Sequence, residues 1–284
     1  MTFRLGCCLV QFNFAGYDFE DALGIIHSIG FEGVETYVPR AVLSKGKTHL
    51  RELLSRNELE PEKFVLGGYG IDAKVGNLAE QDSSRARANQ RNFKKNLLIA
   101  YENGFPATVI FTGPRPKDLS VADALKLAAE NLSPVADFAK DHGIEILVET
   151  HKGALAHDSA SLLRLRKLAA SDNIYANVDP SNYWNDGKDV VEAVTRLGPL
   201  VRGVHVKDAI KVDGKVYWAP SGSGVVDWLA FLKALKEIGY DERSGWLNIE
   251  YEAGISGKFD KDPVKGSKDG YEYISSLARE VSGT

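Results

Sequence analysis

Short apolar segments alternate with amphipathic helical segments along the whole chain, and this alternation restricts the fold more than any other feature. The expected strands cover residues 3–10, 33–38, 64–69, 107–112, 144–151, 174–179, 201–207 and 246–250. The expected helices cover residues 18–28, 44–57, 82–103, 119–142, 158–170, 188–197, 226–238 and 268–281. Eight strand–helix units in a row predict an α/β fold, a single (β/α)8 TIM barrel.

No charge block or linker interrupts this pattern, so we expect one domain over residues 1–284. The rival fold is a doubly wound open sheet. Such a sheet gives no reason for polar residues at the ends of so many strands, and no Gly-x-Gly-x-x-Gly fingerprint follows the first strand. We therefore expect the closed barrel, with its active site at the C-terminal ends of the strands.

The composition restricts partners and location. Of the 284 residues 44% are hydrophobic, enough for a substantial core, and the net charge of −4 argues against a nucleic-acid partner. No apolar run approaches the roughly 20 residues that cross a bilayer, and the N-terminus lacks a cleavable signal pattern. The two cysteines, Cys7 and Cys8, are neighbours in sequence, which disfavours a structural disulfide. We expect a cytoplasmic protein with no membrane partner.

Four residues that can bind a metal lie near the C-terminal ends of four apolar runs: Glu149, Asp179, His205 and Glu250. Alternate residues of a strand share a face, and the polar face of each run would point into the barrel. Several carboxylates on that side need a cation, because a buried unpaired carboxylate is costly. We expect one divalent ion, Mn first, with Mg, Co or Zn as alternatives. Taken singly, each residue could instead be a solvated charge, an ion-pair partner or a core histidine.

The runs also carry short motifs in a fixed order. They are Val148-Glu-Thr-His151, Asn177-Val-Asp-Pro-Ser-Asn182, His205-Val-Lys-Asp208, Ile249-Glu-Tyr-Glu252, Gly222-x-Gly224-Val-Val-Asp227-Trp and Leu235-Lys-x-Ile-Gly-Tyr240. In this order the whole chain resembles the xylose isomerase-like TIM barrels, a superfamily of sugar isomerases and epimerases that also contains the type IV AP endonucleases. The resemblance implies that the quartet holds the metal. From the epimerase-like members it further implies that Glu149 and Glu250 act as acid and base on opposite faces of a sugar.

The implied reaction is proton abstraction next to a carbonyl. A divalent cation would stabilise the enediolate that results, and a carboxylate would take the proton and return it elsewhere. We expect a metal-dependent isomerase or epimerase that acts on a small sugar or sugar derivative. The alternatives are a lyase or dehydratase acting on an oxidised sugar, glycoside or inositol derivative, and a metal-bearing carbohydrate-binding subunit without turnover. Members of the superfamily often associate, so a homo-oligomer is also possible.

Five further residues are candidates for substrate contacts. His151 and Lys207 each follow a metal-ligand candidate by two residues on the same strand face. Trp184 could stack on a sugar, and Glu35 could touch substrate at the barrel mouth, although packing roles are open for both. Asn182 takes the place of a histidine that many relatives carry; it can hydrogen-bond hydroxyls but is a poor metal ligand.

The endonuclease branch uses extra histidines to bind three zinc ions. Here Asn182 replaces one of them, Thr112 ends the fourth expected strand, and the third ends at residues 67–69, Gly-Gly-Tyr. We therefore expect a single metal and no DNA cleavage.

A hairpin is expected over residues 210–218, because Asp213-Gly214 separates two alternating segments. It would project over the catalytic face as a partial lid or an oligomer contact. Asp208, just before it, is expected either to orient its strand neighbours or to cap the loop.

Overall fold

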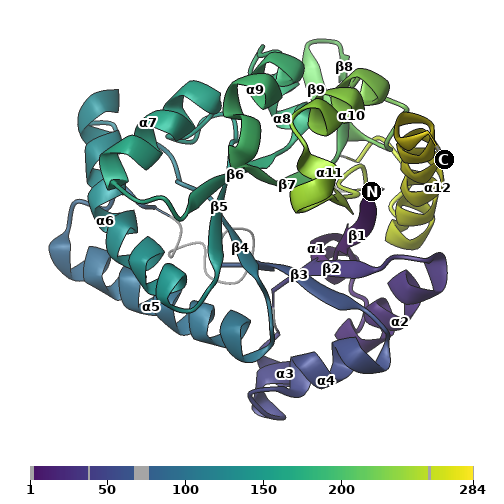
Figure 1. Ribbon diagram of the computed structural model, residues 1–284, viewed down its shortest axis with the longest axis horizontal. Helices are drawn as coiled ribbons and strands as arrows, with labels where there is room; N and C mark the ends of the chain where they lie inside the picture. The colour runs from purple at the N-terminus through teal and green to yellow at the C-terminus, as the bar shows by residue number, and fades with distance from the viewer. Residues whose placement is uncertain (1–2, 38, 67–76, 255–256, 284) are drawn as a thin grey trace.

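The computed structural model describes residues 3–37, 39–66, 77–254 and 257–283, and within them eight parallel strands close into a barrel (Figure 1). The strands, in the order in which they pair around the barrel, are β1 (Arg4–Cys8), β2 (Gly33–Thr36), β3 (Glu60–Val65), β4 (Ala107–Ile110), β5 (Glu145–Glu149), β6 (Ile174–Val178), β7 (Val201–Val206) and β10 (Trp246–Ile249). The predicted (β/α)8 TIM barrel is thus confirmed.

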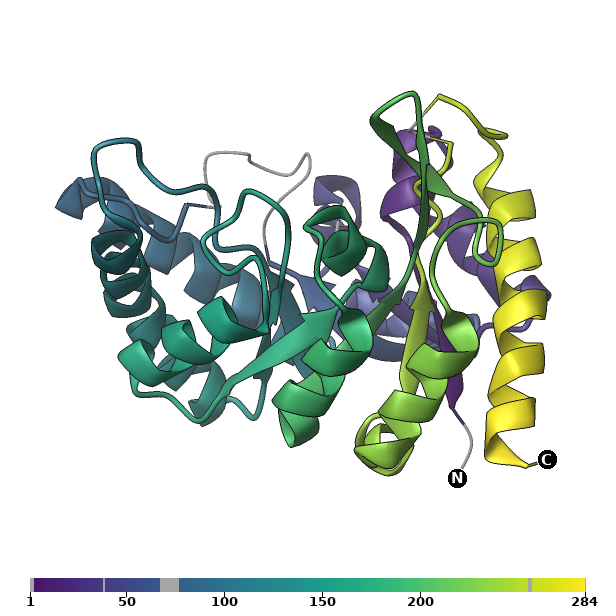
Figure 2. The same cartoon turned by 90° about the horizontal axis from the view of Figure 1, so that it is seen from above.

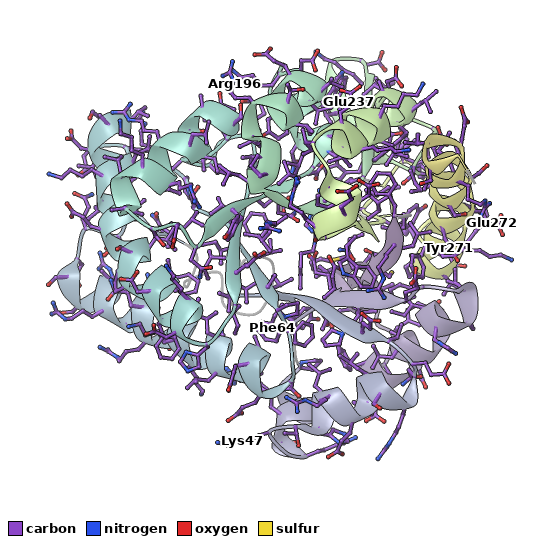
Figure 3. The ribbon with its side chains drawn as sticks, viewed as in Figure 1. Lys47, Phe64, Arg196, Glu237, Tyr271 and Glu272 are labelled. Carbon is purple, nitrogen blue, oxygen red and sulfur yellow. The ribbon has the colours of Figure 1, made fainter. Side chains whose placement is uncertain are left out.

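Helices surround the barrel. The longer ones are α2 (Phe19–Ile29), α4 (His49–Arg56), α5 (Ser83–Glu102), α6 (Val121–Asp141), α7 (Ser159–Ala169), α9 (Val190–Leu197), α10 (Trp228–Glu237) and α12 (Pro263–Ser282). Their outer faces carry charged side chains, and Figure 3 shows Arg196, Glu237 and Glu272 at the periphery. None of the helices in the described part of the chain is long and apolar enough to cross a membrane.

Most helices begin where an aspartate can accept the free backbone N–H groups of the first turn. Asp18 accepts from Glu20 and Asp21 at the start of α2, and Asp189 and Asp262 cap α9 and α12 in the same way. Such a cap is worth about 1 kcal/mol. At the other end of α2, Gly30 adopts a left-handed conformation with φ of 113°, which confirms it as the predicted helix stop.

The two faces of the strands differ as the alternation predicts. The large hydrophobic core, which includes Ile146, Val148 and Val204, packs between strands and helices. A separate small cluster of Ala107, Val109, Leu147 and half-buried Tyr175 lies on the opposite face of β4, β5 and β6. That opposite face is the barrel interior.

The third strand differs from the prediction. It begins at Glu60 rather than at residue 64, and residues 67–69 of the predicted strand lie outside the described residues. The segment Glu60-Pro-Glu-Lys suggests a loop because proline and charges are rare in central strands. In the structure Val34 pairs with Pro61 and Glu35 pairs with Lys63, so Glu62 is an extra residue in β3. This bulge turns both Glu62 and Lys63 into the barrel.

Short helices account for the other differences. The predicted helix 44–57 is shorter in the structure, as α4, and a separate helix α3 (Arg40–Ser44) precedes it. The brief α1 (Val10–Phe14), α8 (Pro180–Asn185), 3-10 helix η1 (Gly198–Leu200) and α11 (Tyr240–Arg243) have no counterpart in the prediction, because single turns carry little periodic signal.

The predicted hairpin is present as β8 (Asp208–Val212) and β9 (Lys215–Ala219), which pair antiparallel. Asp213 and Gly214 both have positive φ, 49° and 80°, as a tight two-residue hairpin turn requires. Figure 2 shows the hairpin rising on one side of the barrel, while the N- and C-termini lie at the other side. Since β8 follows the C-terminal end of β7, the hairpin rises on the side where the strands end.

Candidate metal centre

The structure brings the predicted quartet together. One ligand atom from each of Glu149, Asp179, His205 and Glu250 can be chosen so that all four lie within 4.8 Å of one another. They come from the C-terminal ends of β5, β6, β7 and β10, which follow one another around the barrel. His205 Nδ1 lies 3.1 Å from Glu149 Oε2 and 3.3 Å from Glu250 Oε2. Three carboxylates and an imidazole nitrogen at this spacing can surround one divalent cation.

The four atoms that face the centre of this cluster are buried and, among the described residues, lack a hydrogen-bond partner of good geometry: Glu149 Oε2, Asp179 Oδ2, His205 Nδ1 and Glu250 Oε2. Buried polar atoms in proteins are rarely left in this state. The remaining oxygen of two of the carboxylates is engaged, since Asp179 Oδ1 caps α8 and Glu149 Oε1 accepts from Asn182 Nδ2 at 3.0 Å. The donor set therefore fits a metal ion.

Lys207 forms ion pairs with three carboxylates in and beside the quartet. Its buried ammonium lies 2.8 Å from Asp179 Oδ2, 3.0 Å from Glu250 Oε2 and 2.9 Å from Glu252 Oε2. The same ammonium stands 4.9 Å from the centre of the Trp218 ring on the hairpin. Burial alone would lower the pKa of Lys207, but Asp179, Glu250 and Glu252 raise it well above its ordinary value. Lys207 therefore stays a cation beside the quartet.

His205 is held from its other side by Glu35. His205 Nε2 lies 2.8 Å from Glu35 Oε2 and 3.0 Å from Oε1, and Lys63 Nζ lies 3.0 Å from Glu35 Oε2. Burial alone would raise the pKa of Glu35, but the charges of His205 and Lys63 outweigh it and lower this pKa to about 2. Glu35 is therefore an ionised carboxylate directed at His205. Glu35 also lines the small cavity at the quartet, and its predicted substrate contact stays a prediction.

The other predicted substrate residues lie at different distances from the quartet. Asn182 is buried against Glu149, and its Oδ1 has no partner. His151 is partly exposed and packs edge-on against Phe111, at 6.5 Å between ring centres. Phe111 lines a small cavity that Glu149, His205 and Glu250 also line. Trp184 is half-buried on α8, outside the set of residues that line that cavity. Their substrate contacts stay predictions.

Asp208 serves the loop and not the metal ligands. Its buried carboxylate accepts from the backbone N–H groups of Ala209, Gly222, Gly224 and Val226 and from Trp228 Nε1. Of the two predicted roles, the loop cap is the one the contacts fit. A Cβ on Gly224 would collide with this carboxylate, so the close approach of the loop to Asp208 requires a glycine here.

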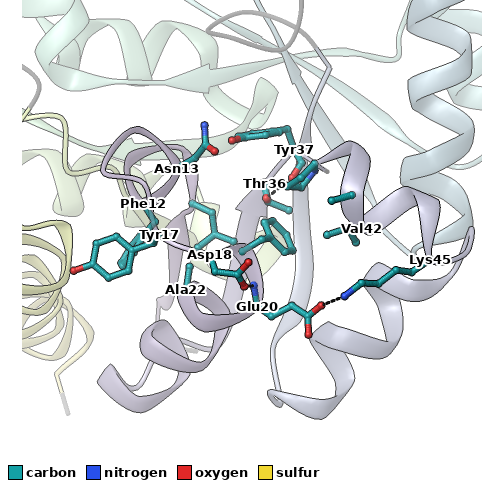
Figure 4. Close-up of a pocket in the computed structure, with 14 residues that line it drawn as sticks. Phe12, Asn13, Tyr17, Asp18, Glu20, Ala22, Thr36, Tyr37, Val42 and Lys45 are labelled. Atoms are coloured by element: carbon teal, nitrogen blue, oxygen red, sulfur yellow. Dashed lines mark hydrogen bonds and ion pairs between the residues drawn. The ribbon is translucent and has the colours of Figure 1, made fainter.

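The cavity above the quartet is small. It measures about 20 Å³ and is lined by Tyr37, Phe111, Glu252 and members of the quartet, among others. This is room for an ion or a water molecule, so a sugar requires side chains at the rim to move. A larger cavity of about 250 Å³ lies between α1, α2 and α3 (Figure 4). Apart from Tyr37 it shares no residue with the quartet's cavity, and its charged pair, Glu20 and Lys45, is exposed.

Two charged residues of the site, Lys63 and Glu252, were not predicted from the sequence. Lys63 lies just before the predicted strand 64–69, and the bulge that turns it into the barrel cannot be predicted from the sequence. Glu252 stands two residues after Glu250, and strand alternation alone would have placed it beside Lys207.

The family of the chain follows from comparison with known proteins. The family described as xylose isomerase-like TIM barrel matches residues 23–277. The chain belongs to this family. An inosose dehydratase of Mesomycoplasma hyopneumoniae is 22% identical over 287 aligned positions, which cover 91% of this chain and 88% of the relative.

Solved structures of the same fold have different descriptions. A D-tagatose 3-epimerase-like protein superposes with a TM-score of 0.80 at 21% identity, covering 99% of this chain and 98% of the other. The IOLI protein with a bound zinc atom superposes with a TM-score of 0.81 at 15% identity, covering 98% and 99%. At these identities the likeness shows the fold alone.

Proposed function

We propose that the protein is a divalent-metal-dependent sugar isomerase or epimerase that works by proton abstraction next to a carbonyl. The observation that carries this proposal is the set of four orphaned ligand atoms at the C-terminal mouth of the barrel. Glu149, Asp179, His205 and Glu250 would hold the metal, with Mn as first choice and Mg, Co or Zn as alternatives. When bound, the metal would act as a Lewis acid that makes the proton beside the substrate carbonyl easier to remove.

Glu250 and Glu149 are proposed as the acid and base. The printed ion pairs of Glu250 with His205 and Lys207 both involve Oε2, so Oε1 is the oxygen we propose to exchange a proton with a substrate carbon. Burial raises the pKa of Glu250, against the charges of Lys207 and His205, which suits proton exchange near neutral pH. In Glu149, the oxygen that does not face the centre of the quartet is Oε1, and it accepts a hydrogen bond from Asn182 Nδ2. Asn182 must therefore release Oε1 when Glu149 takes or returns a proton.

Lys207, His151, Asn182 and Trp184 are proposed to bind the sugar. Lys207 can donate to an oxygen that becomes negatively charged during the reaction, since an ammonium needs no rearrangement to stabilise an anion. Asn182 Oδ1 is a free acceptor for a substrate hydroxyl. The cavity of about 20 Å³ is too small for a sugar, so we propose that the sugar ring lies at the rim, near His151 and Trp218. 

The test is incubation of the Mn-loaded protein with a panel of ketoses in deuterated water. Deuterium should enter an otherwise intact sugar. Glu149→Gln and Glu250→Gln should each lower the exchange rate at least about 100-fold, the size of a lost general acid or base. Glu145→Gln is the control, because Glu145 lies on the same strand and face as Glu149 but at the opposite end, beside Arg202. Full activity in both Gln variants of the quartet would exclude the mechanism.

A second candidate is a dehydratase, and the inosose dehydratase relative favours it. The first step would be the same proton abstraction, followed by loss of water from the neighbouring carbon. The same experiment separates the two, since a dehydratase would convert inosose to a product lighter by one water molecule. A protein that binds Mn but neither exchanges deuterium nor releases water with any substrate would instead be a binding subunit.

A further inference from the structure

From the small cavity at the quartet, which Glu35 and His205 both line, a chain of buried polar contacts crosses the barrel interior. It runs from His205 on β7 to Glu35 on β2, Lys63 on β3 and Asn177 on β6. Lys63 Nζ lies 3.0 Å from Glu35 Oε2 and 2.9 Å from Asn177 Oδ1. All four side chains are at most 2% exposed. Four strands therefore contribute to one fixed arrangement around the imidazole.

Both oxygens of Glu35 are occupied within this arrangement. Oε1 contacts His205 Nε2 at 3.0 Å and is 3.7 Å from Cys8 Sγ, and Oε2 contacts both His205 Nε2 and Lys63 Nζ. His205 is the side chain that contacts both oxygens of Glu35 within hydrogen-bond distance. The contacts direct the whole carboxylate at one nitrogen of one ring.

The two nitrogens of His205 have opposite surroundings. Nε2 faces Glu35, which as a carboxylate can only accept, so Nε2 must carry a proton. Nδ1 faces Glu149 Oε2 and Glu250 Oε2 at the centre of the quartet. A histidine ligand binds a metal through a nitrogen lone pair, and the hydrogen bond made by the other nitrogen decides which one is available.

We propose that Glu35 is a positioning residue that fixes the His205 ring and reserves Nδ1 for the metal, with Lys63 holding Glu35 in place. The inference rests on the metal site of the proposed function. It assigns Glu35 a role in metal affinity.

The chain provides a matched control in Glu62. This residue is also buried, also points into the barrel from β3, and lies 3.6 Å from the same Lys63 Nζ. Its partner on the other side is Asn248, not a residue of the quartet. Replacing Glu62 thus removes a buried carboxylate beside Lys63 without touching His205.

The experiment measures Mn binding to the metal-free proteins by titration calorimetry. Glu35→Gln should weaken Mn binding roughly 10- to 100-fold, the usual cost of removing such a partner of a metal ligand. Glu35→Asp should bind more tightly than Glu35→Gln, because it restores a carboxylate. The Mn affinity of Glu62→Gln should lie within about 3-fold of that of the unsubstituted protein, a smaller change than the loss expected for Glu35→Gln.

Equal losses of Mn affinity in Glu35→Gln and Glu62→Gln, or unchanged Mn affinity in Glu35→Gln, would overturn the proposal. Neither result would contradict the proposed metal site itself. Failure of the unsubstituted protein to bind any divalent metal would overturn the proposed function as well, so the two failures are distinguishable.

A second measurement needs no variant. In the zinc-loaded protein with ¹⁵N-labelled histidine, the NMR spectrum should show His205 protonated at Nε2 and bound to metal through Nδ1. Metal bound through Nε2 would contradict the proposal.

Discussion

At the scale of single residues, the main feature of the site is an excess of buried negative charge. Glu149, Asp179 and Glu250 gather around His205, and Lys207 is the ammonium that lies closest to them. Each uncompensated buried carboxylate would cost several kcal/mol. A divalent cation at the quartet would remove that cost, so metal binding and the stability of this arrangement are linked.

The same charges predict how metal binding depends on pH. Burial alone would lower the pKa of His205, but Glu35, Glu149 and Glu250 raise it well above its ordinary value. Without metal, the imidazole therefore carries a proton on both nitrogens at neutral pH, and a metal must displace the one on Nδ1. Metal affinity should fall about tenfold for each unit by which the pH drops.

Calorimetry in two buffers of different ionisation enthalpy checks this directly. The difference in apparent heat should correspond to release of about one proton per metal bound at neutral pH. Binding that is independent of pH and releases no proton would mean that Nδ1 is already free.

At the scale of secondary-structure elements, Asp208 fixes the base of the β8–β9 hairpin and the start of α10. Four backbone N–H groups and the Trp228 indole donate to its buried carboxylate. Asp208→Asn would place an NH2 group against such donors. We expect this change to lower the free energy of unfolding by about 2–4 kcal/mol.

Urea denaturation of the metal-free protein measures this effect. Asp227→Asn is the matched control, because Asp227 is an exposed helix cap and asparagine caps helices equally well. It should leave stability unchanged within about 0.5 kcal/mol. A similarly small effect for Asp208→Asn would show that the loop does not depend on this carboxylate.

Much of this element arrangement could be predicted from the sequence, because it depends on local periodicity. Alternation along the strand ending at Asp179 correctly assigns Tyr175 and Asn177 to the interior face. The bulge at Glu62 could not be predicted, since it depends on how β2 and β3 pair. Alternation also gives the face of a residue but not its neighbour across the barrel.

The candidate site shows the same limit. The quartet could be predicted because four strand ends must meet at one end of a closed barrel. Glu35 was placed on the correct strand, but its partner could not be foreseen. Its contact with His205 spans 170 residues of sequence and exists only because β2 and β7 lie across one interior.

At the scale of the whole molecule, the outer and inner faces of the barrel strands have different roles. The apolar outer face of the strands packs under the helices and supports the fold. In the polar interior, Lys63 contacts both Asn177 and Glu35, and Glu35 contacts His205 of the quartet. Gly203 leaves space for Asn177, because a Cβ there would collide with its side-chain oxygen. The fold thus supplies a rigid support for the proposed metal.

The most direct test of the central claim is a crystal structure of the Mn-loaded protein with anomalous diffraction data. The account predicts one strong peak per chain, within about 2.0–2.3 Å of Glu149 Oε2, Asp179 Oδ2, His205 Nδ1 and Glu250 Oε2. Lys207 should then keep Glu252 as its partner. Absence of a peak at the quartet, with Lys207 still between Asp179 and Glu250, would contradict the account.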